Sequence, residues 1–280
     1  MPSYRKQFTP EQLKNIFTPL ITERYFRVFR RCPDLTTPSR FTEKLQWIKL
    51  NSDPIELSRF ADKASLGQCL SARIGKDIGF PVKYILGPAE VETLSPSPGT
   101  ILKCNHGSNM NVIPADPPDT ARIIRTLTRY LNTDYSMQCF EPWYHYITPS
   151  VLVEPLLGDL QEIKVWCFNG EVCFYELFKL LSRGEMSISY YDTDWKYMDW
   201  LVRKRFEHNT VHDAPRPSRL DEIRDIAACL CKGFPFVRVD FAMSGNNLYC
   251  SELTFTPTAG FQTYIGDGDL RLGALLQLPS

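Results

Sequence analysis

Two carboxylates lie in neighbouring strand-like runs near the C-terminal end of the chain, where their spacing could support metal binding. The stretch Pro235–Pro257 reads "PFVRVDFAMSGNNLYCSELTFTP", and each run carries one acid, Asp240 or Glu252. Alternate residues of a strand share a face, so Arg238 lies with Asp240, and Thr254 lies with Glu252. Whether these two polar faces coincide depends on the loop that joins the runs.

The loop length sets the register of this hairpin. A three-residue loop of Gly245–Asn247 would pair Ser244 with Leu248. That register would place Asp240 directly opposite Glu252, whereas a two-residue loop would shift the register by one and separate the acids onto opposite faces. Gly and Asn tolerate the positive φ that a three-residue loop needs, so the sequence favours the first register.

Opposed carboxylates admit two interpretations. Directly opposed Cβ atoms lie ~5 Å apart, and two ionised carboxylates at that separation repel unless a cation lies between them. A divalent metal ion is one answer, because hard cations such as Mg²⁺ prefer oxygen ligands. The alternative is an Arg238–Asp240 ion pair on a solvated sheet face, with Glu252 in water. Spacing alone leaves both interpretations open.

A lysine at a strand end could bind phosphate. Lys103 ends an apolar run and precedes the loop "CNHGSN". A lysine charge beside backbone N–H groups suits a phosphate, although the loop is not a Walker A motif and could be an ordinary turn. Lys63 follows Asp62 at a predicted helix start, and it could equally be a surface lysine.

Other polar and aromatic residues carry weaker signals. Glu162 and Lys164 share a strand face, which alone is a common solvated pattern. The aromatic residues Trp195, Tyr197 and Trp200 could line a sugar site, although such spacing more often belongs to a core.

Composition excludes several classes of partner. The 280 residues include 32 Lys and Arg and 32 Asp and Glu, so the net charge of zero gives no global attraction to nucleic acid or an anionic membrane. Nine scattered cysteines show no zinc spacing, which favours reduced thiols and a cytoplasmic location. The polar N-terminus shows no signal peptide, and no apolar run approaches the ~20 residues of a membrane span.

Hydrophobic spacing and turn residues predict an α+β chain with mostly antiparallel strands in its second half. The expected helices follow Thr9 and cover Phe41–Leu50, Asp62–Gly75, Ala115–Asn132 and Ser218–Lys232. The expected strands are Thr100–Cys104, the run opening Ser150–Gly158, the hairpin joined at Asn169-Gly170, and the hairpin described above. Ser182–Pro217 is expected to form loops and short elements.

Taken in order, several motifs resemble one family. They are "FTEKLQWIKL", "ADKASLGQCLSARIG", "ILKCNHGSN", "LVEPLLGD", "IKVWCFNGE", "YYDTDW", "FPFVRVDF" and "SELTFTPTAGF". Together they resemble the TupA-like ATP-grasp proteins, with "LKCNHGS" and "ELTFTP" the most specific. The resemblance covers the chain from about Phe41 nearly to its end.

The resemblance implies an ATP-grasp fold, in which two α+β lobes with antiparallel sheets sandwich ATP after an N-terminal helical segment. The implied division is residues 1–98 for the helical segment, 99–153 for the small lobe with its glycine loop, and 154–280 for the large lobe with the metal-binding hairpin. The implied cofactors are ATP and Mg²⁺.

The resemblance also implies a role for each matching residue. Lys63 and Lys103 resemble the phosphate-binding lysines, and Arg238 resembles the arginine that faces the transferred phosphoryl group, which makes Arg238 and Lys103 the catalytic candidates. The remaining nucleotide-binding candidates are His106, Gly107 and Ser108 in the closing loop, Glu154, Pro155 and Leu156 at the adenine hinge, and Glu162 and Lys164 near the ribose. Asp240 and Glu252 resemble the metal pair, with Thr254 as a third ligand where the general pattern has an asparagine.

The implied reaction is ATP-dependent ligation of a carboxylate to an amine through an acyl phosphate. The TupA-like branch is associated with surface-polysaccharide biosynthesis, so the expected substrate is a small molecule or glycan: an amino acid or other amine joined to a carboxylate on a sugar or its precursor. The alternatives are phosphate transfer to a hydroxyl, a glycosyltransferase, and a non-catalytic nucleotide-binding or scaffold module. The sequence does not specify the oligomeric state.

Overall fold

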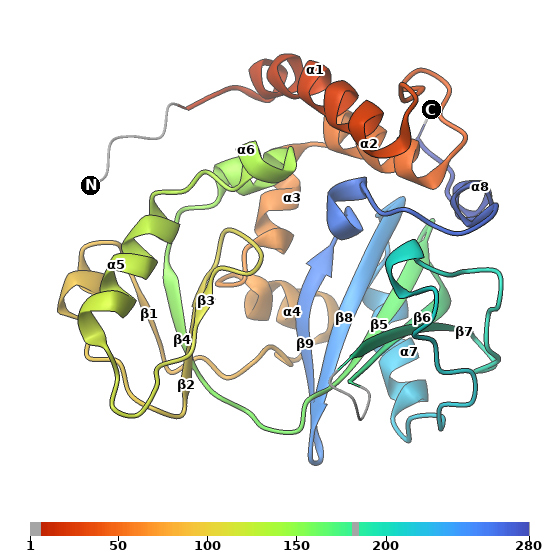
Figure 1. Ribbon diagram of the computed structural model, residues 1–280. Helices are drawn as coiled ribbons and strands as arrows, with labels where there is room; N and C mark the ends of the chain where they lie inside the picture. Colours follow the sequence, from red (N-terminus) through yellow and green to blue (C-terminus); the bar gives the residue numbers. More distant parts are fainter. Residues whose placement is uncertain (1–6, 181–184, 280) are drawn as a thin grey trace.

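The computed structural model describes residues 7–180 and 185–279 of the chain, as two antiparallel sheets with helices around them (Figure 1). The smaller sheet has four strands in the order β1-β4-β2-β3, and the larger has five in the order β7-β6-β5-β8-β9. The strands of the smaller sheet are β1 (Tyr84–Leu86), β2 (Thr100–Cys104), β3 (Asn111–Val112) and β4 (Val151–Pro155). Those of the larger sheet are β5 (Gln161–Phe168), β6 (Glu171–Leu180), β7 (Met186–Asp192), β8 (Phe236–Ser244) and β9 (Asn247–Thr254).

Helix α5 (Thr120–Leu131) covers the smaller sheet. Asp119 caps its first turn by accepting a hydrogen bond from the backbone N–H of Arg122. The spacing of Ile123, Leu127 and Leu131 gives the helix one apolar stripe, and these side chains pack against buried residues of β2 and β4. The small lobe therefore has its own core.

Helix α7 (Leu220–Leu230) covers one face of the larger sheet, with α4 (Leu66–Ile74) beside it. Their apolar side chains join those of β5, β8 and β9 in one core. The opposite face carries a second core of aromatic rings at one end, where Phe41 packs against Trp166, Phe168 and Phe236. The other end of this face, beyond the aromatic rings, lies next to the smaller sheet.

The N-terminal helices close the molecule at one end. Helix α1 (Pro10–Phe29) follows Thr9, as expected from the sequence, and begins with a capping box between Thr9 and Gln12. It packs on α2 (Phe41–Asn51), which packs on the C-terminal helix α8 (Gly268–Leu275). The chain enters α1 at the end that lies away from α8 (Figure 1).

Most predicted elements are present, and their differences from expectation are informative. Asp62 does not start a helix but caps the C-terminal end of α3 (Pro54–Ala61), a helix that was not predicted. The predicted helix, α4, begins only at Leu66. The segment predicted as loops contains a full strand, β7, although residues 181–184 lie outside the described residues. The helix expected over Ser218–Lys232 begins at Leu220, with no side-chain cap.

The C-terminal hairpin reaches the predicted pairing by a different route. Ser244 pairs with Asn247, so the loop has two residues, and the predicted three-residue loop is wrong. A β-bulge between Asp240 and Phe241 then shifts the register back by one residue, because Ser251 is the extra residue on β9. Asp240 therefore lies opposite Glu252, as expected, and both face the same side of the sheet.

The register aligns one polar row across all five strands of the larger sheet. Its members, taken from β9 to β7, are Glu252, Asp240, Lys164, Glu176 and Tyr190. Side chains on one face of neighbouring strands contact each other directly, so this row places Lys164 between two acids and sets Asp240 beside Glu252.

The sheet boundaries do not coincide with residues 98 and 153. Strand β1 lies before residue 99 but pairs with β4, and β4 continues to Pro155 within the smaller sheet. The three-part division of the chain stays a prediction, with β1 belonging structurally to the small lobe.

None of the described helices is long and apolar enough to cross a lipid bilayer. All nine cysteines lie within the described residues, and each is a free thiol.

Candidate active site

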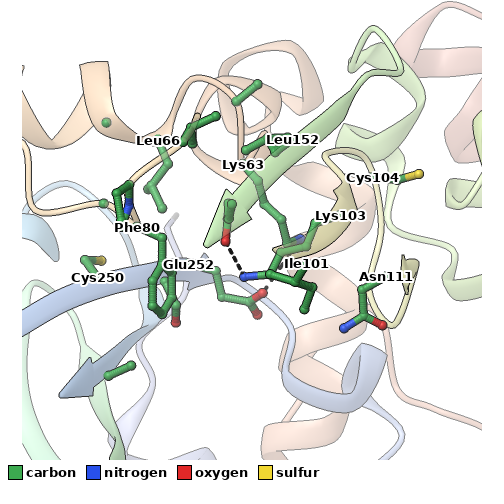
Figure 2. A pocket seen from close by; sticks show the side chains of 18 of the residues that line it. Lys63, Leu66, Phe80, Ile101, Lys103, Cys104, Asn111, Leu152, Cys250 and Glu252 are labelled. Atoms are coloured by element: carbon green, nitrogen blue, oxygen red, sulfur yellow. Dashed lines mark hydrogen bonds and ion pairs between the residues drawn. The ribbon is translucent and has the colours of Figure 1, made fainter. Parts of the chain in front are cut away.

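A cavity of about 750 Å³ opens between the two sheets. Residues of β2 and β4 line one wall, residues of β5, β8 and β9 line the opposite wall, and the start of α4 with the loop after it closes a third side. Figure 2 shows the side chains of Lys63, Lys103 and Glu252 pointing toward one another inside this space. The predicted nucleotide residues that line it are Lys63, Lys103, Gly107, Ser108, Glu154 and Glu162.

Lys103 and Glu154 form an ion pair on the small-lobe wall. The Nζ atom of Lys103 lies 2.6 Å from Oε2 of Glu154, and 4.6 Å from the centre of the Phe80 ring. The register sets Lys103 opposite Leu152 and Ile101 opposite Glu154, so the pair is a diagonal contact between adjacent strands. An ammonium has three donors, so Lys103 can keep Glu154 and still bind a phosphate oxygen.

Lys63 connects the glycine loop to Glu252 of β9. Its Nζ donates a hydrogen bond of 2.8 Å to the carbonyl of Gly107 and lies 3.8 Å from Oε2 of Glu252. The side chain thus lies between the loop that would close over phosphates and the carboxylate that would bind their metal ion.

Asp240 is buried and held by two cations. Its Oδ1 accepts from Nε of Arg238 at 2.6 Å, while Oδ2 accepts from Nη2 of Arg238 at 2.6 Å and from Nζ of Lys164 at 3.2 Å. Burial alone would raise the pKa of Asp240, but Arg238 and Lys164 outweigh it and lower that pKa below its usual value. The carboxylate is therefore ionised at neutral pH.

Glu252 is less enclosed, with 34% of its side chain exposed. Its Oε1 accepts a 2.6 Å hydrogen bond from the hydroxyl of Thr254, and that hydroxyl in turn accepts from Arg238 at 3.3 Å. The predicted metal ligands Asp240, Glu252 and Thr254 are thus brought together on one face, with Arg238 between them.

The donor set fits a magnesium ion that shares its ligands with a nucleotide. No cluster of three or more metal-binding acids, histidines or cysteines occurs among the described residues. Mg²⁺ commonly takes one or two carboxylates and completes its shell with water and phosphate oxygens. A carboxylate has about four lone-pair positions, and Asp240 uses three, so Oδ1 keeps one for a metal ion. Glu252 can supply a second ligand.

Four predicted nucleotide residues, His106, Pro155, Leu156 and Lys164, lie outside the cavity lining. The Nζ atom of Lys164 lies against the buried Asp240 at 3.2 Å. The His106 ring is buried in the small lobe, where Nδ1 lies 3.2 Å from Oδ1 of Asn105 and Nε2 lies 3.2 Å from the carbonyl oxygen of Tyr130. Pro155 has no N–H, and the N–H of Leu156 donates to the carbonyl of Gly99. Neither hinge residue therefore has a free backbone donor for adenine in this structure, which leaves Glu154 as the hinge candidate that faces the cavity.

The predicted aromatic residues pack within the large lobe. Trp195 stacks on Tyr191 with ring centroids 4.4 Å apart, and its indole N–H donates to the carbonyl of Ala214. Tyr197 stacks on His212, and Arg271 lies over the Trp200 ring. Of the two interpretations, the structure favours packing over a sugar site.

Two residues that the sequence analysis did not single out join the lysine-bearing segments. The Asn105 side chain is buried, and its Nδ2 donates to Oδ1 of Asp62 at 2.8 Å and to the carbonyl of Thr148 at 2.9 Å. Its Oδ1 accepts from the backbone N–H of Ser150 at 2.7 Å. Asn105 thereby fixes the start of the glycine loop against the segment that carries Lys63. Both residues stand inside quoted motifs, but 43 residues apart, and sequence alone does not show that they meet.

The family model described as TupA-like ATPgrasp matches residues 43–277. This chain belongs to the TupA-like ATP-grasp family. The resemblance drawn from the motifs is therefore confirmed, and the two-lobed α+β fold with an N-terminal helical segment is the fold expected from it.

Comparison with other proteins adds distant structural similarity. A D-alanine–D-alanine ligase from Helicobacter pylori is 16% identical with a TM-score of 0.41, covering 78% of this chain and 62% of that one. The ATP complex of a D-alanine–D-alanine ligase from Bacillus anthracis is 15% identical with a TM-score of 0.41, covering 70% and 55%. A biotin carboxylase–β,γ-ATP complex from Campylobacter jejuni is 15% identical with a TM-score of 0.43, covering 81% and 48%. The chain thus spans less than two thirds of each of these structures, and no curated protein matches it.

The two walls of the cavity carry groups of different chemistry. The small-lobe wall carries Lys103 and the glycine loop, which suit phosphates. The large-lobe wall carries Glu252 and leads to the buried Asp240, which suits a metal ion.

Proposed function

We propose that this protein is an ATP-dependent ligase that joins a carboxylate to an amine. The observation that carries the proposal is the convergence of Lys63, Lys103 and Glu252 on one cavity between the two sheets. Phosphate-binding cations on one wall and metal-binding carboxylates on the other are what transfer of a γ-phosphoryl group requires.

The reaction proceeds in two steps. A substrate carboxylate attacks the γ-phosphorus of ATP and releases ADP, which forms an acyl phosphate. The amine then attacks the acyl carbon, and the amide forms with release of phosphate and a proton. Because water would hydrolyse the acyl phosphate, closure of the glycine loop is needed to exclude it.

The residues of the chain have separate tasks in these steps. Lys63 and Lys103 neutralise phosphate charge as the γ-phosphoryl group moves, and Arg238 stabilises the acyl phosphate. Asp240 and Glu252 would hold Mg²⁺, which would supply further neutralisation of phosphate charge. Arg238 is held in place by its paired contacts with Asp240, so its remaining donors have a fixed direction.

We infer that the carboxylate belongs to a sugar or polysaccharide precursor and that the amine is an amino acid or a similar compound. The support is the association of the TupA-like branch with surface-polysaccharide biosynthesis. The protein would need no nucleic-acid partner, since its net charge is zero.

Substrate-dependent ATP turnover tests this function. The protein is incubated with Mg·ATP and paired panels of uronic acids and amino acids, and ADP, free phosphate and new products are measured by coupled assay and mass spectrometry. A ligase releases phosphate in equal amount to an amide product. Phosphate attached to a product hydroxyl would identify a phosphotransferase instead, and no substrate-dependent ADP release across the panels would contradict both.

A further inference from the structure

The motif "FTEKLQWIKL" lies on α2, which contributes no residue to the cavity lining. Its polar side chains are nevertheless buried: Gln46 is 0% and Lys49 is 1% exposed. Burial of an amide or an ammonium group is unfavourable unless hydrogen bonds replace those to water. The partners of these two side chains therefore indicate why α2 carries them.

Both residues hold the turn that follows β9. Nε2 of Gln46 donates to the carbonyls of Ala259 at 3.3 Å and Gly260 at 2.9 Å. Nζ of Lys49 donates to the same Ala259 carbonyl at 2.6 Å and to the carbonyl of Cys139 at 2.9 Å. Gln46 and Lys49 thus form a clamp, named here the α2 clamp, on the turn Pro257–Gly260.

The turn has a conformation that its residues do not favour. Thr258 has φ 52° and ψ 34°, Ala259 has φ 52°, and Gly260 has φ 70°. The left-handed region costs roughly 1–2 kcal/mol for each residue that carries a Cβ, and it is least favourable for a β-branched one. Thr258 is also exposed, so packing around its side chain does not impose the conformation. The conformation is imposed instead by the α2 clamp, whose hydrogen bonds hold the carbonyls of Ala259 and Gly260 after Thr258.

The fit between the clamp and the turn is close. A Cβ on Gly260 would lie 2.4 Å from Nε2 of Gln46, which is too near for any contact. Only glycine can present its carbonyl to Gln46 at this point, and glycine alone adopts the positive φ without cost.

The turn is joined to the candidate active site through the end of β9. It begins three residues after Thr254, the last residue of β9, and five residues after Glu252. Thr256, at its start, donates a hydrogen bond to Oε1 of the buried Glu141. Because only Phe255 and Thr256 separate the turn from β9, a displaced turn would pull on the end of the strand that carries Glu252 and Thr254.

We propose that Gln46 and Lys49 are positioning residues that hold the turn Pro257–Gly260, and thereby hold Glu252 and Thr254 in the geometry that binds the metal–nucleotide complex. The proposal rests on the proposed function, because it assigns these residues to that same site. It gives a role to the N-terminal motif that the phosphate and metal residues leave unexplained.

The test uses Mn²⁺ as a probe metal with ADP, because Mn²⁺ has an electron paramagnetic resonance signal and prefers oxygen ligands as Mg²⁺ does. Binding is titrated for the wild type and for Gln46→Ala, Lys49→Met and Lys49→Arg. Lys44→Met is the matched control: Lys44 lies on the same helix and donates to two carbonyls, Gly273 at 2.9 Å and Leu276 at 2.6 Å, but does not contact the turn.

Residues that support metal ligands typically change metal affinity by about 10- to 100-fold when removed. We expect Gln46→Ala and Lys49→Met to weaken Mn²⁺·ADP binding by at least about tenfold, Lys49→Arg to restore part of it, and Lys44→Met to stay within about twofold. Hydrogen–deuterium exchange at residues 256–261 is expected to rise in the first two variants only.

Equal affinities for Lys44→Met, Lys49→Met and Gln46→Ala would overturn the proposal, as would unchanged exchange in the turn. If Lys49→Met does not fold, the Mn²⁺·ADP affinities of Gln46→Ala and Lys49→Arg are compared instead, and equal affinities would overturn the proposal. If the wild type binds no Mn²⁺·ADP, the proposed function fails, whereas the exchange data still report separately whether the clamp holds the turn.

Discussion

At the scale of single residues, Asp240 and Glu252 differ in how much of the fold depends on them. Asp240 is 5% exposed and is the shared partner of Arg238 and Lys164, whereas Glu252 reaches the cavity with a third of its side chain exposed. Removing one member of a buried ion pair leaves a charge without a partner, which typically costs about 3–5 kcal/mol. The two carboxylates should therefore respond differently to neutralisation.

The first prediction compares Asp240→Asn with Glu252→Gln. Both variants are expected to lose Mg²⁺-dependent ATP turnover, because each removes one metal ligand. Asp240→Asn is also expected to lower the free energy of unfolding by about 3 kcal/mol, and Glu252→Gln by less than about 1 kcal/mol. Urea denaturation beside a turnover assay gives both quantities, and equal stability losses would contradict the assigned burial.

The second prediction concerns the ionisation of Lys49. Burial lowers the pKa of Lys49 to about 8, although the charge of Glu141 opposes the shift; Cys139 and Arg24 are the other charged or titratable groups that face it. The unfolded chain has the ordinary lysine pKa of about 10.5, so it binds more protons than the folded protein between pH 8 and 10.5. The contribution of Lys49 to stability therefore rises with pH across that window.

Denaturation of the wild type and Lys49→Met at several pH values measures this contribution. The difference in unfolding free energy, wild type minus variant, is expected to grow from pH 8 to pH 10.5. A difference that stays constant or falls would contradict a lysine whose pKa is lowered by burial.

At the scale of elements, the glycine loop after β2 has little room for a side chain. A Cβ on Gly107 would lie 2.4 Å from Sδ of Met110 and 2.9 Å from Cγ of Tyr135. The Gly107 carbonyl is also the partner of Lys63, so a displaced loop would move that lysine.

The third prediction follows from this crowding. Gly107→Ala is expected to raise the KM for ATP by about tenfold or more, since misplaced positioning groups commonly cost that much in rate or binding. Gly158→Ala is the control, because a Cβ there would meet no atom within 4 Å and its φ is not positive. An unchanged KM in Gly107→Ala would show that the loop does not bind the phosphates.

The hairpin of β8 and β9 shows how far sequence reasoning reaches at this scale. The alternation of side chains indicated that the acids could share a face, and this pairing is confirmed. The loop length was wrong, and a bulge at Ser251 compensates for the difference. A bulge leaves no strong signal in composition, because it depends on how the whole strand twists against its partner.

Other differences arise from contacts that are distant in sequence. Strand β7 was predicted as part of a loop segment, since its aromatic and serine residues gain their strand conformation by pairing with β6. The bond between Asp62 and Asn105 joins residues 43 apart, and each motif alone shows only a polar residue near a lysine. The lysines and acids could be predicted from the sequence; the residues that hold their segments together could not.

At the scale of the whole molecule, the polar row of the larger sheet continues past the candidate active site. Glu176 is 1% exposed and accepts from Arg203 at 2.6 Å and from the indole N–H of Trp166 at 2.8 Å. Arg203 also donates to the Tyr190 hydroxyl at 2.6 Å and comes from the segment after β7. This pair fastens a covering segment to the sheet beneath it.

The fourth prediction is that Glu176→Gln destabilises the fold. Arg203 would lose its counter-charge in a buried position, so the free energy of unfolding is expected to fall by about 3–5 kcal/mol. Asp194→Asn removes the exposed partner of Lys196, where both side chains are about three-quarters exposed, and is expected to change stability by less than about 0.5 kcal/mol. Similar losses in the two variants by chemical denaturation would contradict the structural role of Glu176.

The arrangement of the two lobes is the basis of the proposed function, since only their apposition brings the small-lobe lysine and the large-lobe carboxylates to one cavity. The most direct measurement is isothermal titration calorimetry of the full chain with ADP, with and without Mg²⁺, for the wild type, Lys103→Met and Glu252→Gln. ADP binding is expected to require Mg²⁺ in the wild type. It is expected to weaken by about tenfold or more in each variant, because Lys103 and Glu252 contribute from opposite walls of the cavity. Absence of binding, or equal affinity in all three proteins with and without Mg²⁺, would contradict a metal–nucleotide site between the lobes.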